Sequence, residues 1–275
     1  MSAPSDEVCT IALAQLSIEP GAVEENLERA TAAIERAASR GADLICLPEL
    51  FTVGYFSFDR YDAASEALDG PTGRRLASAA ADNDVAVLGG SVVEDLSATT
   101  VEPTPAASGL ANTAVLYDSS GARKLVYRKH HLFGYDSKEA ELLVPGDRLE
   151  VVDLCGFTVG VTTCYDLRFP SLYRSLVDRG VTLVLVPSAW PYPRIEHWTI
   201  LTRARAIENQ WYLAAVNGSG AMDGSTLLGR STVYDPWGNA VASSGDEPTL
   251  ILADLDPARV RAVRDSFPAL RDRRR

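Results

Sequence analysis

The chain of 275 residues has few of the side chains that build many active sites. Histidine occurs 3 times, and two of these residues, His130 and His131, are adjacent, so we expect no histidine-based metal centre. The sequence contains no G-x-S-x-G, S-x-x-K, Walker A or G-x-G-x-x-G pattern. These absences exclude the common serine-hydrolase, P-loop and dinucleotide-binding signatures.

Lysine is equally scarce. It occurs only as Lys124, Lys129 and Lys138, and every other residue among the 26 basic ones is arginine. Arginine stays protonated and offers a planar fork of donors, whereas lysine is a compact point charge whose pKa responds to its surroundings. Each lysine is therefore a candidate for a role that arginine cannot fill.

The charge balance and the hydropathy pattern exclude two broad classes. Asp and Glu number 37 against 26 Lys and Arg, and this net charge of -11 disfavours a nucleic-acid-binding domain. No apolar run reaches the ~18–20 residues that span a bilayer. The first residues are acidic, whereas a signal peptide begins with a basic region. We therefore expect a cytoplasmic protein that contacts neither nucleic acid nor membrane.

The four cysteines indicate the redox environment. Cys9, Cys46, Cys155 and Cys164 form no C-x-x-C pair, which argues against a zinc ribbon or a thioredoxin motif. In a reducing compartment they are expected to be free thiols.

Short apolar runs alternate with helical periodicities in the first third of the chain. Leu27, Ala30 and Ile34, for example, recur at helical spacing. The pattern predicts strands over Val8–Leu16, Asp43–Leu47 and Val85–Gly89, and helices over Glu24–Arg40 and Thr72–Asn83. This β-α-β-α-β order is typical of a layered α/β domain.

Hairpins and further β-α units follow. We expect hairpins that pair Asn112–Tyr117 with Lys124–Arg128, Glu150–Asp153 with Thr158–Thr163, and Leu228–Asp235 with Asn239–Ser243. We expect helices over Phe169–Arg179 and Ile195–Asn209 and strands over Val181–Val186, Tyr212–Val216 and Leu250–Asp254. This mixture predicts a mixed sheet or a pair of sheets. The Pro- and Thr-rich stretch Leu96–Gly109 is predicted to be a surface loop.

Three reactive side chains each follow an apolar strand, where α/β domains build their sites. They are Glu49 after DLICLP, Lys129 after LVYR and Cys164 after VGVTT. A cysteine thiolate is a strong nucleophile, and a helix N-terminus or a nearby cation favours it. A glutamate can act as its general base, and a lysine can stabilise a developing oxyanion.

Each of the three also has a structural alternative. Cys164 could be a small buried hydrophobe, which is how we interpret the other three cysteines. Glu49 could be a solvated residue at the start of a loop, and Lys129 could be an ordinary surface lysine.

The motifs around these residues resemble those of the carbon–nitrogen hydrolases of the nitrilase superfamily. PEL contains Glu49, YRKHHLF contains Lys129 and CYDLRFPSLYR contains Cys164, in the order that the superfamily shows. The resemblance continues through VPSAW, HWTILTRARAIENQWYLAAVN and GRSTVYDPWG, and it covers nearly the whole chain.

The resemblance implies an α/β fold, the four-layer α-β-β-α sandwich. It implies one carbon–nitrogen hydrolase domain over residues 6–265, with residues 1–5 and 266–275 as terminal segments. It assigns Glu49 as general base, Lys129 as the cation beside the oxyanion and Cys164 as nucleophile. No metal or organic cofactor is implied.

The resemblance also implies a second glutamate. In the family this residue lies between the lysine and a Pro-Gly pair, and here SKEAELLVPG offers Glu139 and Glu141. Counting back from Pro145 favours Glu139.

The implied reaction is hydrolysis of a small amide through a thioester, with Lys129 and the backbone N–H of Tyr165 at the oxyanion. The pair Tyr165-Asp166 after the nucleophile favours amides over nitriles. The longer motif is most similar to omega-amidases and deaminated glutathione amidases, which act on the terminal carboxamide of small 2-oxo acids and related compounds. Arg168 is then a candidate to bind a substrate carboxylate, and the alternative is an ion pair with Asp166.

Tyr55 and Trp190 are candidates to line the pocket, and core packing is the alternative for Tyr55. Other functions stay open. They are an N-carbamoyl amino acid hydrolase or a nitrilase of the same superfamily, an acyltransferase that uses the same thioester, and a non-catalytic binding protein. Because the family commonly dimerises through one face of the sandwich, we expect a homodimer or a higher homo-oligomer.

Overall fold

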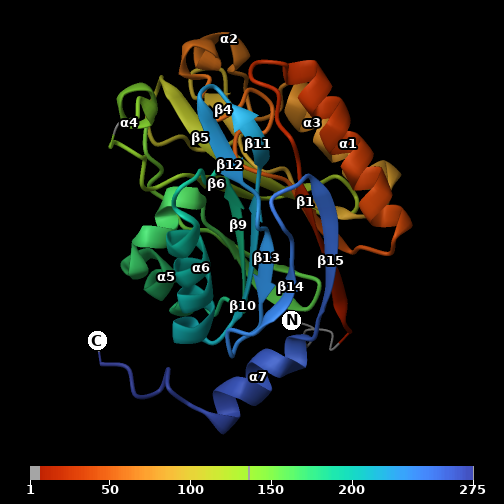
Figure 1. The fold of residues 1–275 in the computed structure, drawn as a ribbon, viewed down its shortest axis with the longest axis vertical. Coiled ribbons are helices and arrows are strands. Elements are labelled where there is room, and N and C mark those ends of the chain that lie inside the picture. The colour runs from red at the N-terminus through yellow and green to blue at the C-terminus, as the bar shows by residue number, and fades with distance from the viewer. Residues whose placement is uncertain (1–6, 136, 275) are drawn as a thin grey trace.

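Two β-sheets lie face to face in the computed structural model, which describes residues 7–135 and 137–274, and helices cover the outer face of each sheet (Figure 1). The strands of the first sheet are β1 (Cys9–Gln15), β2 (Leu44–Cys46), β3 (Ala86–Leu88), β4 (Val92–Asp95), β5 (Leu110–Tyr117), β6 (Arg123–Arg128) and β15 (Thr249–Leu255). Their order is β15-β1-β2-β3-β5-β4, and β6 pairs with β5.

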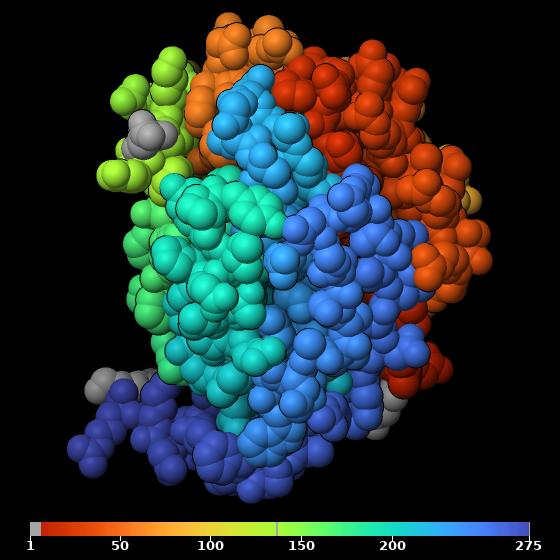
Figure 2. Space-filling view, in the orientation of Figure 1, coloured from red at the N-terminus to blue at the C-terminus, as the bar shows by residue number. Residues whose placement is uncertain are grey.

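The second sheet has the order β14-β13-β10-β9-β8-β7. Its strands are β7 (Val151–Leu154), β8 (Phe157–Val161), β9 (Leu183–Ser188), β10 (Tyr212–Asn217), β13 (Thr232–Tyr234) and β14 (Ala240–Ser243). A separate hairpin consists of β11 (Ser219–Met222) and β12 (Ser225–Leu228). In Figure 2 this light-blue hairpin lies on the surface beside the orange region of the chain.

The helices flank these sheets. They are α1 (Val23–Ser39), α2 (Tyr61–Ala64), α3 (Pro71–Asp82), α4 (Glu139–Leu142), α5 (Pro170–Val177), α6 (Ile195–Asn209) and α7 (Pro257–Ser266). Short 3-10 helices cover Phe58–Arg60 and Cys164–Arg168.

The alternation of side chains along the strands creates three apolar layers. On β1, Ile11 and Leu13 pack between the two sheets, whereas Ala12 faces the helical layer of α1. On β10, Val216 packs between the sheets and Leu213 packs against the layer of α5 and α6. Three buried interfaces between four layers give the order α-β-β-α, so the predicted sandwich is confirmed.

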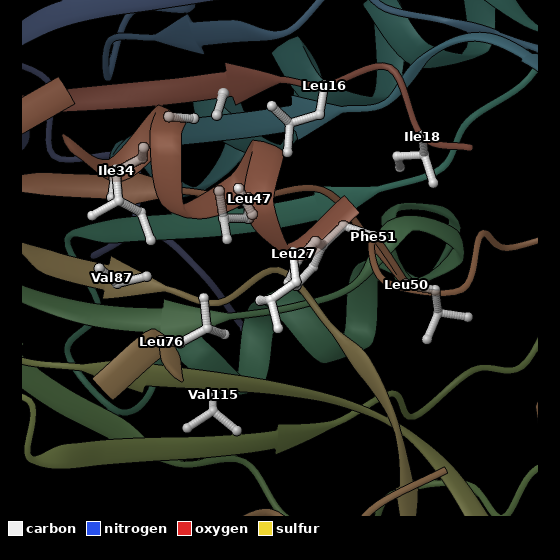
Figure 3. Packing of buried hydrophobic residues seen from close by; sticks show 14 of the residues in the cluster. Leu16, Ile18, Leu27, Ile34, Leu47, Leu50, Phe51, Leu76, Val87 and Val115 are labelled. Carbon is white, nitrogen blue, oxygen red and sulfur yellow. The ribbon is translucent and has the colours of Figure 1, made fainter. Parts of the chain in front are cut away.

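Figure 3 shows the interface between the first sheet and the helices α1 and α3. Leu27 and Ile34 of α1 and Leu76 of α3 pack onto Val87 and Val115 of the first sheet. Because Leu27 and Ile34 are seven residues apart, they lie on one face of the helix, as the periodicity predicts.

One expected strand is wrong. Residues 228–235 do not form a continuous strand, since β12 ends at Leu228 and β13 begins at Thr232 in a different sheet. Between them, Gly229 and Arg230 have φ angles of 62° and 55°. This left-handed backbone interrupts a strand, and only the glycine is visible in the sequence as a signal for it.

Helix α7 was not anticipated, although the sequence carries its start signal. The Asp256 side chain accepts a hydrogen bond from the backbone N–H of Ala258, and Pro257 occupies the first helical turn. An N-cap aspartate followed by proline is a typical helix start.

The strand directions bring the reactive side chains to one edge. Strand β6 runs antiparallel to β5, which runs antiparallel to β3, so β6 has the direction of β2 and β3. In the other sheet, β8 and β9 are parallel. The backbone N–H of Glu49, after β2, donates to the carbonyl of Ser188 at the end of β9. The two sheets therefore present the ends of these strands at a common edge.

Candidate active site

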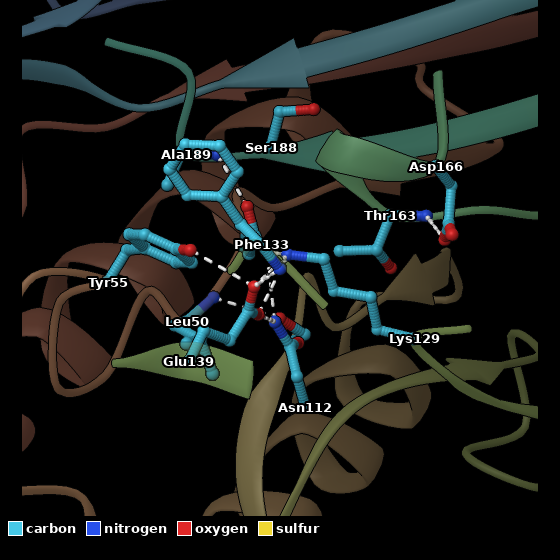
Figure 4. Close-up of polar contacts among 12 residues, drawn as sticks. Leu50, Tyr55, Asn112, Lys129, Phe133, Glu139, Thr163, Asp166, Ser188 and Ala189 are labelled. Atoms are coloured by element: carbon cyan, nitrogen blue, oxygen red, sulfur yellow. Dashed lines mark hydrogen bonds and ion pairs between the residues drawn. The ribbon is translucent and has the colours of Figure 1, made fainter. Parts of the chain in front are cut away.

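Glu49, Lys129 and Glu139 form a buried charged cluster at this edge. Figure 4 shows Lys129 and Glu139 among their polar contacts. The Lys129 Nζ lies 2.8 Å from Glu49 Oε1, and 2.8 Å and 2.9 Å from the two carboxylate oxygens of Glu139. The two glutamates are 0% exposed and the lysine is 1% exposed. Water screens this cluster little, so each charge acts strongly on its neighbours.

The scarcity of lysine did point to an unusual residue. Lys124 lies at the surface beside Asp118, and Lys138 is exposed. Lys129 is the buried one, so its alternative interpretation as a surface lysine is wrong. The alternative of a solvated Glu49 is wrong for the same reason.

Two groups that the sequence did not single out hold Glu49 in place. The Asn112 amide donates to Glu49 Oε1 at 2.9 Å and to Glu139 Oε1 at 3.1 Å. The backbone N–H of Ala189 donates to Glu49 Oε2 at 2.9 Å. Both oxygens of Glu49 are therefore directed by fixed donors. Asn112 lies within β5, whose apolar pattern gives no sign that an amide there contacts two carboxylates.

Glu139 is held by donors from a different part of the chain. Its Oε2 accepts from the hydroxyl of Tyr55 at 3.0 Å and from the backbone N–H of Phe133 at 2.7 Å. Glu141 is exposed, so of the two candidates for the second glutamate only Glu139 lies in the cluster. Tyr55 both lines the pocket and bonds to the cluster, so simple core packing does not describe it.

Cys164 begins the 3-10 helix that follows β8. Its φ angle of 45° is in the left-handed region, which is uncommon for a residue with a side chain and marks a constrained turn. The buried carboxylate of Asp166 supports this turn. It accepts hydrogen bonds from the backbone N–H of Thr163 at 2.9 Å, from the Tyr127 hydroxyl at 2.6 Å and from His131 Nδ1 at 2.7 Å.

The electrostatic environment keeps the thiol protonated. Burial and the negative charge of Glu49 raise the pKa of Cys164 well above its usual value, and the smaller opposing effects of Lys129 and the Ala189 N–H do not offset them. Lys129 does favour the thiolate, but burial and the Glu49 carboxylate outweigh it, so a base has to take the thiol proton during the reaction.

Glu49 is correspondingly basic. Burial raises the pKa of Glu49, Lys129 lowers it and Glu139 raises it, and the net shift is upward. The neighbouring Cys164 thiol lowers the pKa of Glu49 slightly. For Lys129, burial alone would lower the pKa, but the two carboxylates raise it well above its usual value. The arrangement pairs a protonated thiol with a base and a permanent cation.

A pocket opens from this cluster to solvent. Its walls are mainly aromatic, and its residues are Tyr55, Phe56, Lys129, Phe133, Cys164, Tyr165, Arg168, Ala189, Trp190, Pro191 and Arg194. The lining thus includes Tyr55, Tyr165, Arg168 and Trp190, all of which the sequence put forward as site residues. Arg194 was not put forward.

Arg168 does not pair with Asp166, so that alternative is wrong. The bonds to Tyr127, Thr163 and His131 occupy the carboxylate of Asp166. The guanidinium of Arg168 instead lies over the rings of Trp190, at 4.9 Å, and Tyr165, at 5.7 Å, and donates to Nδ1 of His197 at 3.2 Å. It faces the pocket rather than an internal partner.

The described residues contain neither a metal-binding cluster nor a membrane-spanning helix. Among residues 7–135 and 137–274, no group of three or more His, Cys, Asp or Glu side chains is arranged to hold a metal ion. In the same part of the chain, no helix has the length and apolar character needed to cross a membrane.

Comparisons with known proteins agree with this geometry. The family model for carbon-nitrogen hydrolases matches residues 10–265. A 2-oxoglutaramate amidase of Paenarthrobacter nicotinovorans is 38% identical over 237 residues, which cover 85% of this chain and 79% of that protein.

Solved structures show the same relationship. A Saccharomyces cerevisiae protein of branch 10 of the nitrilase superfamily superimposes with a TM-score of 0.85 at 30% identity, over 95% of each chain. An amidase variant of Nesterenkonia sp. AN1 matches with a TM-score of 0.80 at 30% identity, over 100% of this chain and 97% of that one. That structure shows covalent addition of the acetamide moiety of fluoroacetamide at the active-site cysteine. The fold, the matched residues and these relatives together show that the chain belongs to the carbon–nitrogen hydrolase family, within the nitrilase superfamily.

Proposed function

We propose that this chain is a cysteine-dependent amidase that hydrolyses the carboxamide of a small 2-oxo acid to the acid and ammonia. The observation that carries the proposal is that Cys164 and Lys129 line one pocket and that the buried carboxylate of Glu49 contacts Lys129 beside it. The name of the relative, 2-oxoglutaramate amidase, supports the substrate class. Arg168 at the same pocket supports a carboxylate on the substrate.

In the first half-reaction, Cys164 attacks the amide carbonyl. At rest the Cys164 thiol is protonated and Glu49 is a deprotonated carboxylate. The proton therefore moves from sulfur to Glu49 as the carbon–sulfur bond forms. The carbonyl oxygen becomes an oxyanion, which the Lys129 ammonium and the backbone N–H of Tyr165 stabilise. Glu49 then returns the proton to the leaving nitrogen. The carbon–nitrogen bond breaks, ammonia departs, and a thioester on Cys164 remains.

In the second half-reaction, water hydrolyses the thioester. Glu49 takes a proton from the water as its oxygen attacks the carbonyl, and the same oxyanion contacts act again. The carbon–sulfur bond breaks, the carboxylic acid leaves, and the proton on Glu49 passes to the Cys164 sulfur. Glu139 keeps Lys129 in position through two short contacts and adds the negative charge that makes Glu49 a stronger base.

Ammonia release from a substrate panel tests the proposal. The panel holds 2-oxoglutaramate, deaminated glutathione, a simple aliphatic amide, an N-carbamoyl amino acid and a nitrile, each with wild type, Cys164→Ala and Cys155→Ala. We expect release from the 2-oxo acid amide, its loss in Cys164→Ala and its retention in Cys155→Ala, since Cys155 lies outside the pocket. Activity that survives in Cys164→Ala would contradict the assigned nucleophile. Release from only the carbamoyl compound or the nitrile would contradict the substrate class.

The proposal extends to assembly. Ile200 and Ile207, seven residues apart on α6, are 59% and 48% exposed, and Trp237 stacks with the exposed Phe267 at 5.9 Å. Figure 2 shows the teal α6 beside the blue β13–β14 region on one face. We propose that this face joins two copies of the chain. Sedimentation should give at least a dimer for wild type and one subunit for Ile200→Glu combined with Ile207→Glu, whereas a monomeric wild type would contradict it.

We further propose that residues 6–265 act as one catalytic domain and that the enzyme works in the cytoplasm. A reducing compartment keeps a nucleophilic cysteine as a free thiol, which the mechanism needs. Cell fractionation with an antibody against the chain tests the compartment. Enrichment in the periplasmic or secreted fraction would contradict it.

A further inference from the structure

Two guanidinium groups, those of Arg168 and Arg194, line the pocket. Among residues 7–135 and 137–274, neither Asp nor Glu lines it. In the part of the chain that the structure describes, neither guanidinium forms an ion pair with a carboxylate. The buried carboxylates of Glu49 and Glu139 both form ion pairs with Lys129, which lines the pocket. An acidic protein thus has a locally cationic entrance to its site.

Arg194 is held there by its backbone. Its carbonyl accepts from the Trp190 indole N–H at 3.0 Å and from the backbone N–H of Trp198 at 3.1 Å. Its guanidinium lies over the ring of Phe133, at 5.6 Å from the ring centroid. Because the aromatic ring takes one face of the guanidinium, the N–H edge stays available to a ligand.

The chemistry of this entrance distinguishes the groups that can occupy the 2-position of an acid. A carboxylate, a 2-oxo group or a 2-hydroxyl can accept from guanidinium donors. A 2-ammonium group has only donors and a positive charge, so it needs a carboxylate or carbonyl acceptor. The described lining side chains offer no acidic acceptor, and the ammonium group would lie beside guanidinium charge.

We propose that Arg194 is a specificity-determining residue that selects 2-oxo acid amides against 2-amino acid amides such as glutamine. In this arrangement Arg168 binds the substrate carboxylate, and Arg194 donates to the 2-oxo oxygen and repels a 2-ammonium group. The inference rests on the proposed amidase function and deepens it. It names the feature that lets this pocket reject an amino acid whose reactive carboxamide is the same.

Three substrates separate donation to the 2-oxo oxygen from repulsion of the 2-ammonium group. They are 2-oxoglutaramate, L-glutamine and glutaramate, which share a carboxylate and a carboxamide and differ only at the 2-position. The quantity to measure is kcat/KM for ammonia release in wild type, Arg194→Gln, Arg194→Lys and Arg194→Glu. Arg203→Gln is the matched control. Arg203 lies on α6, the helix that begins directly after Arg194, but its guanidinium lies over the ring of Tyr234 outside the pocket.

We expect Arg194→Gln to lower the ratio of kcat/KM for 2-oxoglutaramate to kcat/KM for glutamine by about tenfold, because the repulsion between Arg194 and the 2-ammonium group is removed. Arg194→Glu should lower this ratio further, because it turns the repulsion into attraction. Arg194→Lys should keep most of the ratio, and Arg203→Gln should keep all of it. Glutaramate turnover should change little in Arg194→Gln, since it has neither group at the 2-position. Arg168→Gln should lower kcat/KM for all three substrates, because all three carry the carboxylate.

The outcomes are distinguishable. A ratio that stays at the wild-type value in both Arg194→Gln and Arg194→Glu overturns the role of Arg194 while the amidase function stands. Equal losses on all three substrates would also overturn it, since they would place Arg194 on the shared carboxylate. No ammonia release from any carboxamide by wild type would instead contradict the proposed function itself. If the Arg194→Glu chain does not fold, Arg194→Gln and Arg194→Lys still decide the question.

Discussion

Arg128 and Lys129 are neighbours at the end of β6, and each belongs to a different buried charge cluster. Arg128 makes a bidentate pair with Glu94, with N–O distances of 2.7 Å and 2.8 Å, and Thr113 adds a hydrogen bond to the same carboxylate. We call Glu94, Thr113 and Arg128 the Arg128 cluster. Lys129 instead contacts two carboxylates, those of Glu49 and Glu139.

The difference lies in charge balance and in surroundings. The Arg128 cluster has one positive and one negative charge and holds the loop after β4, since Arg128 also donates to the carbonyl of Pro103 at 3.1 Å. The Lys129 cluster carries two carboxylates for one cation and opens onto the pocket beside Cys164. Balanced buried pairs fix structure, whereas an unbalanced cluster leaves a carboxylate able to accept a proton.

Replacing Lys129 should give the largest effect. We expect Lys129→Ala to lower kcat by about 10³-fold or more, because the oxyanion loses its cation and two buried carboxylates lose their partner. Lys129→Arg should restore little of the rate, since a planar fork cannot reproduce the contacts of a compact ammonium. Steady-state kinetics of the folded variants measure this.

The matched control is Arg128→Lys, which keeps the charge next to Lys129 and removes the bidentate geometry. It should lower stability and leave kcat per folded molecule near wild type. A comparable loss of kcat in Arg128→Lys and Lys129→Ala would mean that the two clusters do not differ in function.

Removing the partner of Arg128 should affect stability first. Glu94→Gln leaves a buried guanidinium without its carboxylate, and we expect the free energy of unfolding to fall by about 3 kcal/mol. Denaturant titration measures the change, and an activity assay at low temperature should find the remaining folded protein fully active. Retained stability with lost activity would reverse the roles that we assign to the two clusters.

How far the sequence predicts this arrangement depends on the kind of interaction. The sandwich follows from alternating apolar patterns, which depend on local periodicity. The positions of Glu49, Lys129 and Cys164 follow from motifs at strand ends. The contacts of Asn112 and Ala189 with Glu49 could not be predicted from the sequence. Asn112 lies on β5, which is not adjacent to β2 in the first sheet, and Ala189 follows β9 in the second sheet.

The protonation state of Cys164 also depends on contacts that the sequence does not contain. A helix start and a nearby cation favour a thiolate. The sequence cannot show that the thiol is buried beside Glu49, and burial and this carboxylate raise the pKa of Cys164. Whether a nearby cation or a nearby carboxylate dominates depends on distances that only the fold defines.

Glu139→Gln converts the Lys129 cluster to the charge balance of the Arg128 cluster. The negative charge of Glu139 raises the pKa of Glu49, so its removal should lower that pKa. Glu49 acts as a base only when deprotonated, so the acid limb of kcat/KM should move to lower pH in the variant. A pH profile of kcat/KM for wild type and Glu139→Gln measures the shift, and a limb that moves to higher pH would contradict the coupling.

Tyr55→Phe should have the smallest effect, because it removes only one of several donors to Glu139. The hydroxyl donates to Oε2 at 3.0 Å, yet Lys129 and the Phe133 N–H donate to the same oxygen. We expect a stability loss of about 1 kcal/mol and a fall in kcat of less than about tenfold. The aromatic ring, which lies 5.3 Å from Lys129 Nζ, remains in this variant.

Tyr55→Leu removes the ring as well as the hydroxyl, and it therefore separates the two contributions. If the ring helps to hold the ammonium over the pocket, Tyr55→Leu should lose more activity than Tyr55→Phe at similar stability. Equal kcat values in the two variants would assign the whole effect to the hydroxyl and its bond to Glu139. The Lys129 cluster would then be held in position by ion pairs and hydrogen bonds without a contribution from the aromatic ring.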